Sequence, residues 1–206
     1  GAHNMSYIVQ VTRQIAAAAE TAAARLQNGG RLGYVGAGTS GRVAVQDGVE
    51  LGPTFGWPDT RLLYLLAGGT DALVHSAEGA EDDADDARSR IDEAAIGRGD
   101  VVIGVAASGR TPFTIAALKA AKEAGALTIA IANNAGTELL DAADHGLLAA
   151  TGSEAIAGST RMKAGTAQKA ILNLLSTAIM LRLGRVYRGL MVDMVISNEK
   201  LLNRAF

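Results

Sequence analysis

Cysteine is absent from the 206-residue sequence, which excludes a disulfide framework, a thiolate metal site and a cysteine nucleophile. Charge of one sign is also missing, since 19 basic and 21 acidic residues give a net charge of -2 without a basic cluster. That balance argues against nucleic acid or an anionic membrane as a partner. No apolar run reaches the roughly 20 residues that a membrane span needs. We therefore expect a cytoplasmic protein that binds neither nucleic acid nor membrane.

Apolar residues, in contrast, are plentiful. They make up 49% of the chain against 19% charged residues, a composition typical of folded proteins. The length fits one large domain. Residues 1–4, which precede Met5, are interpreted as an expression scar. We expect residues 5–206 to form one domain.

The fold class follows from the order of the apolar segments. A low aromatic content of 4%, with abundant alanine and glycine, favours helices packed closely on a sheet. Because helical stretches alternate with the strand-like runs, right-handed crossovers predict an α/β fold, a three-layer αβα sandwich with a doubly wound, five-stranded parallel sheet. The five predicted strands are 32–35, 61–66, 101–106, 127–132 and 146–150, and two C-terminal helices are expected at 162–183 and 191–205.

A glycine-rich loop at 36–41 follows the first predicted strand. It has the spacing G-x-G-x-x-G, but the second strand ends without the carboxylate that a dinucleotide site needs. A phosphate-binding P-loop is also excluded, because Arg42 and Val43 stand where Lys and Ser or Thr are required. What remains is a helix start that suits a small phosphate monoester. Its candidate binding residues are Gly38, Thr39 and Ser40.

Two more loops of this kind follow later in the chain. One comes after the third strand, and the other precedes the helix predicted at 162–183. For any single loop, the alternative is that a Ser or Thr only caps a helix. Three such loops at one edge of a parallel sheet favour a ligand, since ligands bind beyond the carboxyl ends of the strands. The added candidates are Ser108, Gly109, Arg110 and Thr111, and Ser159, Thr160 and Lys163.

Carboxylates near these loops are candidates for acid or base chemistry. Glu50 ends the helix that starts in the first loop, and Glu78 and Glu81 follow the second strand. A carboxyl group in a cleft can act as a general acid or base. The acidic run at 78–86 is also typical of a solvated face, and it lacks the spacing of a calcium loop. We predict no metal site, and the residues alone do not specify a reaction.

Four segments carry a resemblance to a known family: 30–42, 78–82, 106–112 and 158–169. With these motifs the chain resembles a sugar isomerase (SIS) domain, and within that fold the N-acetylmuramic acid 6-phosphate etherases. The similarity covers nearly the whole chain from Gly29 onward. The glucokinase regulatory protein shares part of the pattern.

The resemblance implies a lyase that cleaves the D-lactyl ether of N-acetylmuramic acid 6-phosphate, giving N-acetylglucosamine 6-phosphate and D-lactate during cell-wall recycling. It implies no metal or organic cofactor. By motif position, Glu50 corresponds to the acid that serves the lactate and Glu81 to the base at C2. It also implies a homodimer whose site lies at the subunit boundary.

Two other functions stay open. Around Glu50 the family usually has D-A-S-E-C-P-P-T, whereas residues 47–54 are D-G-V-E-L-G-P-T. This departure is compatible with a non-catalytic, phosphosugar-binding regulatory domain. An aldose-ketose phosphosugar isomerase would share the fold and the one-base chemistry.

Overall fold

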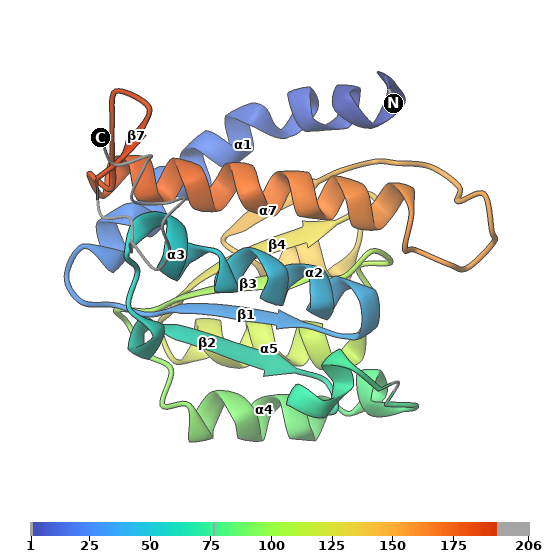
Figure 1. Ribbon diagram of the computed structural model, residues 1–206. Coiled ribbons are helices and arrows are strands. Elements are labelled where there is room, and N and C mark those ends of the chain that lie inside the picture. Colours follow the sequence, from blue (N-terminus) through green and yellow to red (C-terminus); the bar gives the residue numbers. More distant parts are fainter. Residues whose placement is uncertain (1, 76, 193–206) are drawn as a thin grey trace.

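A five-stranded parallel sheet forms the middle layer of the computed structural model, which describes residues 2–75 and 77–192 (Figure 1). The strand order is β2-β1-β3-β4-β5, and every neighbouring pair is parallel. The predicted five-stranded α/β sandwich is thereby confirmed. The strands are β1 (Leu32–Gly36), β2 (Leu62–Leu66), β3 (Val101–Val105), β4 (Leu127–Ala132) and β5 (His145–Leu148).

Helices cover both faces of this sheet (Figure 1). One layer contains α1 (Ala2–Leu26), α2 (Gly38–Val49), α3 (Leu51–Phe55) and α7 (Lys163–Arg182). The other contains α4 (Ala84–Glu93), α5 (Pro112–Glu123) and α6 (Glu138–Ala142). Three short 3-10 helices also lie within the described residues. They are η1 (Asp59–Arg61), directly before β2, and η2 (Thr70–Leu73) and η3 (Ala80–Asp82), between β2 and α4.

The strands read as continuous apolar runs because the sheet is buried on both sides. Successive residues of β1 alternate between the two cores, with Tyr34 facing α2 and α7 and Val35 facing α4 and α5. Every residue of β1, β3 and β4 is buried. This is the pattern expected of a parallel sheet between two helical layers.

The first glycine-rich loop has a packing role. A Cβ atom at Gly36 would lie 2.9 Å from the Cα of Gly41, so the end of β1 and the start of α2 approach too closely for any side chain. Backbone contact between strand and helix thus explains the first and last glycines of the G-x-G-x-x-G spacing, whereas the middle one, Gly38, has a positive φ of 52°. This contact positions the N-terminus of α2 at the carboxyl edge of the sheet.

The chain after α7 differs from the expectation. An antiparallel hairpin of β6 (Val186–Tyr187) and β7 (Leu190–Met191) stands where the predicted helix 191–205 begins, and residues 193–205 of that prediction lie outside the described residues. The two-residue turn consists of Arg188 and Gly189 with φ of 52° and 83°. Two positive φ values in succession are typical of the type I′ turn that joins antiparallel strands. Within the described residues, no helix is long and apolar enough to cross a membrane.

An ion pair stabilises the edge of the sheet at which the strands begin. It joins Arg31, directly before β1, to Asp100, directly before β3. The Arg31 guanidinium donates to Asp100 at 2.7 Å, and the Arg31 and Gly97 backbone N–H groups donate to the same carboxylate. Burial alone would raise the pKa of Asp100, but these hydrogen bonds outweigh it and lower that pKa below its usual value. The ionised form of Asp100 therefore stabilises the fold.

Replacing Asp100 with Asn tests this ion pair. We expect Asp100→Asn to lower the free energy of unfolding by about 2 kcal/mol at pH 7, because charge-assisted hydrogen bonds are lost. A carboxyl group with a lowered folded-state pKa stabilises above its unfolded-state pKa, and this contribution is lost as the pH falls through the folded-state pKa. The difference between parent and variant should therefore shrink below about pH 4 in urea unfolding. A difference that stays constant with pH would contradict this account.

Candidate functional site

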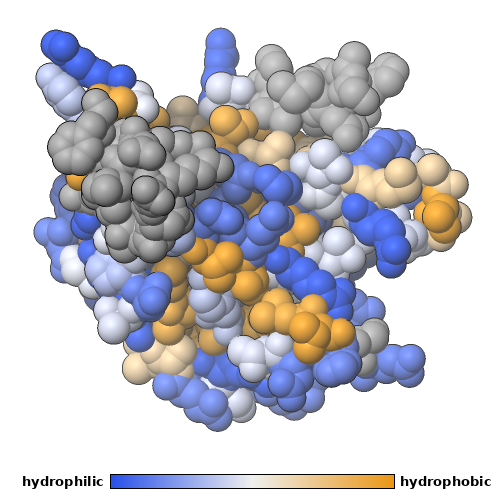
Figure 2. Space-filling view, viewed as in Figure 1, coloured by the Kyte–Doolittle hydropathy of each residue, from blue (hydrophilic) through white to orange (hydrophobic). Residues whose placement is uncertain are grey.

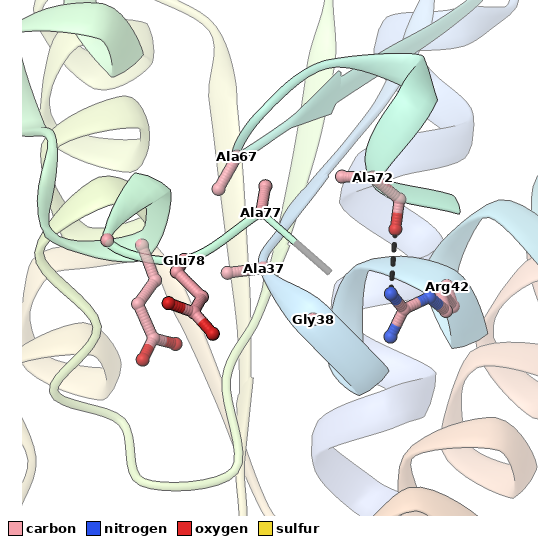
Figure 3. A pocket seen from close by; sticks show the side chains of 9 residues that line it. Ala37, Gly38, Arg42, Ala67, Ala72, Ala77 and Glu78 are labelled. Atoms are coloured by element: carbon pink, nitrogen blue, oxygen red, sulfur yellow. Dashed lines mark hydrogen bonds between the residues drawn. The ribbon is translucent and has the colours of Figure 1, made fainter. Parts of the chain in front are cut away.

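A cavity of about 300 Å³ lies beyond the carboxyl ends of β1 and β2, and we call it the strand-tip cavity (Figure 3). Figure 3 shows Glu78 on one side of it and Gly38 and Arg42 on the other. The cavity opens next to the position where the strand order reverses between β1 and β3, which is where ligands of open α/β sheets bind. Its lining residues are Ala37, Gly38, Arg42, Ala67, Ala72, Ala77, Glu78, Gly79 and Glu81.

Arg42 holds one wall of the strand-tip cavity. Its guanidinium donates to the carbonyl oxygens of Leu73 at 3.0 Å and Ala72 at 2.8 Å (Figure 3), and to that of His75 at 3.2 Å. These bonds tie α2 to the η2 segment. This structural role of Arg42 was not predicted from the sequence, because it depends on a segment 30 residues away.

The first predicted loop contributes the N-terminus of α2 to this cavity. Gly38 has φ of 52° and starts the helix, and the N-cap residue Ala37 has no side chain that could accept a hydrogen bond there. Thr39 is half-buried and Ser40 is buried. The backbone N–H groups of this first turn carry the positive end of the helix dipole. The loop therefore has the chemistry of an anion site.

The third predicted loop lies beside the first. A Cβ atom added to Gly165, in the first turn of α7, would be 3.5 Å from the Thr39 methyl group. Ser159 and Thr160 are both half-buried, and the Thr160 carbonyl accepts from the Gly165 N–H at 2.9 Å. The structure thus brings two of the three loops together.

A carboxylate of the chain itself occupies the start of α7. Glu154 accepts from the Lys163 N–H at 3.1 Å and from the Ala164 N–H at 2.8 Å. A negative group at a helix N-terminus satisfies free donors and interacts favourably with the dipole. The backbone of Lys163 is therefore already engaged by an anion, which the sequence did not indicate.

The second predicted loop lines a separate cavity of about 320 Å³, with Ser108 and Arg110 on one side and Asn134 and Ala135 on the other. The Ser108 hydroxyl accepts from the Arg110 N–H at 3.2 Å. Gly109 has φ of 65°, and a Cβ there would meet the Thr137 hydroxyl at 2.3 Å. The β4 side of this cavity was not predicted, because nothing in residues 133–137 by itself indicates a ligand.

Helix capping does not account for the hydroxyls of these loops. Within the described residues, the N-cap positions of α2, α5 and α7 are Ala37, Thr111 and Met162, and none of them makes a side-chain capping hydrogen bond. Thr111 precedes Pro112, which takes the first helical position as predicted. The alternative, in which each Ser or Thr of these loops only caps a helix, is therefore wrong for these three helices.

The two candidate carboxylates lie in different cavities. Glu81, on η3, is exposed and lines the strand-tip cavity. Glu50 follows the last residue of α2 and lines another cavity of about 300 Å³, which we call the α2–α7 cavity. Because α2 has 12 residues, its two ends are roughly 18 Å apart. Besides Glu50, the residues that line the α2–α7 cavity are Gln46, Asp47, Leu51, Thr54, Phe55, Lys169, Asn173, Ser176 and Thr177.

A buried carboxylate fixes the end of α2 that precedes Glu50. Asp47 accepts from the Tyr34 hydroxyl at 2.8 Å, the Asn173 amide at 2.7 Å and the Ser176 hydroxyl at 2.9 Å. Burial raises the pKa of Asp47, and the three hydrogen bonds oppose that rise. The network joins β1, α2 and α7, and it was not predicted from the sequence.

Comparisons with known protein families agree with this architecture. The family model "Glucokinase regulatory protein N-terminal SIS domain" matches residues 14–122, and the model "SIS domain" matches residues 81–178. A solved phosphoheptose isomerase from Francisella tularensis has a TM-score of 0.62 at 17% identity, with 86% of this chain and 93% of that chain covered. At that identity the likeness concerns the fold alone.

Curated relatives are closer in sequence. N-acetylmuramic acid 6-phosphate etherase from Rubrobacter xylanophilus is 51% identical over 192 residues, which cover 93% of this chain and 64% of that protein. The enzyme of the same name from Symbiobacterium thermophilum is 52% identical, with 93% of this chain and 63% of that protein covered. The chain thus spans less than two thirds of the length of these relatives.

Removing the Glu154 carboxylate tests its contact with α7. We expect Glu154→Ala to lower the free energy of unfolding by about 1–2 kcal/mol, the usual cost of losing a helix cap. Glu154→Gln, which keeps an acceptor but not the charge, should cost less. Urea unfolding at neutral pH measures both, with Glu20→Gln at an exposed position of α1 as the control. An unchanged stability in Glu154→Ala would contradict the capping role.

Proposed function

Because this chain belongs to the SIS-domain family and is about half identical to N-acetylmuramic acid 6-phosphate etherases, we propose that it carries out the lyase reaction of those enzymes. The substrate is N-acetylmuramic acid 6-phosphate, and the products are N-acetylglucosamine 6-phosphate and D-lactate. One observation supports the proposal most strongly. Over 93% of this chain, about half of the aligned residues are identical to those of enzymes of that name.

The sugar phosphate is proposed to bind beyond the carboxyl ends of β1 and β3. The α2 start, with Gly38, Thr39 and Ser40, offers backbone N–H groups and hydroxyls to the phosphate oxygens. The β3 side of the site is formed by Ser108, Gly109, Arg110 and Thr111. The α7 side is formed by Ser159, Thr160 and Lys163. The proximity of Thr39 to the start of α7 supports this arrangement.

The chemistry follows from the acidity of the C2 proton beside the aldehyde of the open-chain sugar. In the proposed sequence, Glu81 removes that proton, and the C3–O bond breaks as Glu50 protonates the departing lactate oxygen. Water then adds at C3 of the unsaturated sugar while a proton returns to C2. One carboxylate and one carboxylic acid suffice for these steps, so we propose no cofactor.

A single copy of the chain does not bring the two glutamates together, since they lie in separate cavities at the two ends of α2. We therefore propose a homodimer in which Glu50 of one protomer reaches the strand-tip cavity of the other. Apolar side chains near the α2–α7 cavity support this, since Val49 is 50% and Leu174 45% exposed. Figure 2 shows apolar patches among the polar side chains of this face.

The substrate class also bears on location. A sugar phosphate carries charge that is costly to transfer into a bilayer, so it stays in the compartment where it is formed. We propose that the protein acts in the cytoplasm on such a phosphorylated amino sugar.

A second candidate function is phosphosugar binding without turnover. The match of residues 14–122 to the SIS domain of a regulatory protein favours it, as does the altered sequence at 47–54. A binding domain would be stabilised by the sugar phosphate without releasing lactate.

Replacement of each glutamate tests the lyase. We expect Glu81→Gln and Glu50→Gln to reduce D-lactate release at least about 100-fold, because a positioned acid or base is lost. Both variants should still be stabilised thermally by N-acetylglucosamine 6-phosphate. Asp82→Asn, the exposed neighbour of Glu81, is the matched control. Full activity in Glu81→Gln would contradict the assignment, and thermal stabilisation without lactate from the parent would favour the binding domain.

Mixing the two inactive variants tests the shared site. If each site takes Glu50 from one protomer and Glu81 from the other, a mixed dimer has one intact site and one doubly altered site. Random exchange of subunits should then restore about one quarter of the parent activity, since half of the dimers are mixed. Unfolding and refolding the variants together, followed by the lactate assay, measures this. Absence of recovery, with dimers present by light scattering, would mean that both glutamates act within one protomer.

A further inference from the structure

The α2–α7 cavity contains a positive charge that the proposed reaction has not used. Among the described residues that line it, Lys169 is the single cation, and it shares the cavity with the exposed carboxylate of Glu50. Lys169 projects from α7, whereas Glu50 comes from the end of α2. The cavity therefore offers an acid and a cation from two different elements.

Lys169 is held by the buried Asp47 network. Its ammonium group donates to the Asn173 Oδ1 at 2.9 Å, and the Asn173 Nδ2 donates to Asp47 at 2.7 Å. The amide orientation follows, because the NH₂ group must face the carboxylate and the oxygen is left for the lysine. Asn173 takes one of the three ammonium donors, and no salt bridge joins Lys169 to a described carboxylate. The cation is thus positioned, with hydrogen-bonding capacity left for a ligand.

The connectivity of a lactyl ether matches this arrangement. Its ether oxygen and its carboxylate are bonded to the same carbon atom, so an acid at the first and a cation at the second must lie in one cavity. The same carbon carries a methyl group, and Leu51 and Phe55 supply an apolar wall. Acid, cation and apolar surface are therefore present together for the three groups on that carbon.

We propose that the α2–α7 cavity of one protomer is the subsite for the lactyl arm of a sugar bound at the strand-tip cavity of the other protomer, and that Lys169 binds the carboxylate of that arm. The assignment rests on the proposed etherase function. Lys169 then determines specificity, since a sugar phosphate whose 3-O substituent lacks a carboxylate leaves the ammonium without its ligand. Charge-assisted hydrogen bonds are stronger than neutral ones, so the preference is carried by this contact.

The test compares two substrates in two proteins. The substrates are N-acetylmuramic acid 6-phosphate and its lactamide analogue, in which a neutral amide replaces the carboxylate. The parent should prefer the carboxylate in kcat/KM by about tenfold or more. Lys169→Met should raise KM for the carboxylate substrate and lose the preference, and Lys169→Arg should regain part of it. Lys119→Met, on α5 at the other face of the sheet, is the matched control. An unchanged preference in Lys169→Met would overturn the proposal.

A binding measurement separates this proposal from the proposed function. If the parent releases no lactate, thermal shifts with N-acetylmuramic acid 6-phosphate and N-acetylglucosamine 6-phosphate still compare ligands with and without the lactyl arm. We expect a larger shift with the lactyl compound in the parent and equal shifts in Lys169→Met. Equal shifts in the parent would exclude the subsite whether or not the protein is an enzyme.

Discussion

The burial of both faces of the parallel sheet is the constraint on which the rest of the structure depends. Each crossover helix must start at the carboxyl edge of the sheet and run back along a face to the opposite edge. Helix starts therefore gather at one edge, where their N–H groups can meet an anion, and helix ends lie far from it. This geometry brings Gly38 to the strand-tip cavity and carries Glu50 about one helix length away, roughly 18 Å.

Polar groups inside the α2 and α7 layer complete this arrangement. Asp47 is a buried carboxylate whose three donors come from β1 and α7, and such a group is tolerated only when its lone pairs are satisfied. The same hydrogen bonds fix the end of α2 and, through Asn173, the ammonium group of Lys169. One network thus positions both polar groups that we assign to the lactyl arm.

The helix starts at the ligand edge differ in what they already bind. The N-terminus of α7 holds the carboxylate of Glu154, whereas α2 has the side-chain-poor Ala37 at its cap. Among the described residues no side chain caps α2, so its first-turn N–H groups can meet an anionic ligand, whereas at α7 such a ligand would compete with Glu154. Capping by a remote carboxylate leaves no local pattern in the sequence, because Glu154 lies nine residues before Lys163.

The sequence by itself determined the five strands, the helix start at Pro112, and the loops that face the ligand edge, whereas α2 starts at Gly38, three residues before the predicted Gly41. Those features are local, since they depend on apolar runs, glycine conformation and proline geometry. The hairpin at Val186–Met191 was not predicted from the sequence, because two such short strands are recognised only by their pairing. Only the tertiary structure decided that Glu50 and Glu81 lie in separate cavities and that Lys169 shares one of them. Such placements depend on the length of α2 and on how α7 packs against it, which no stretch of sequence specifies alone.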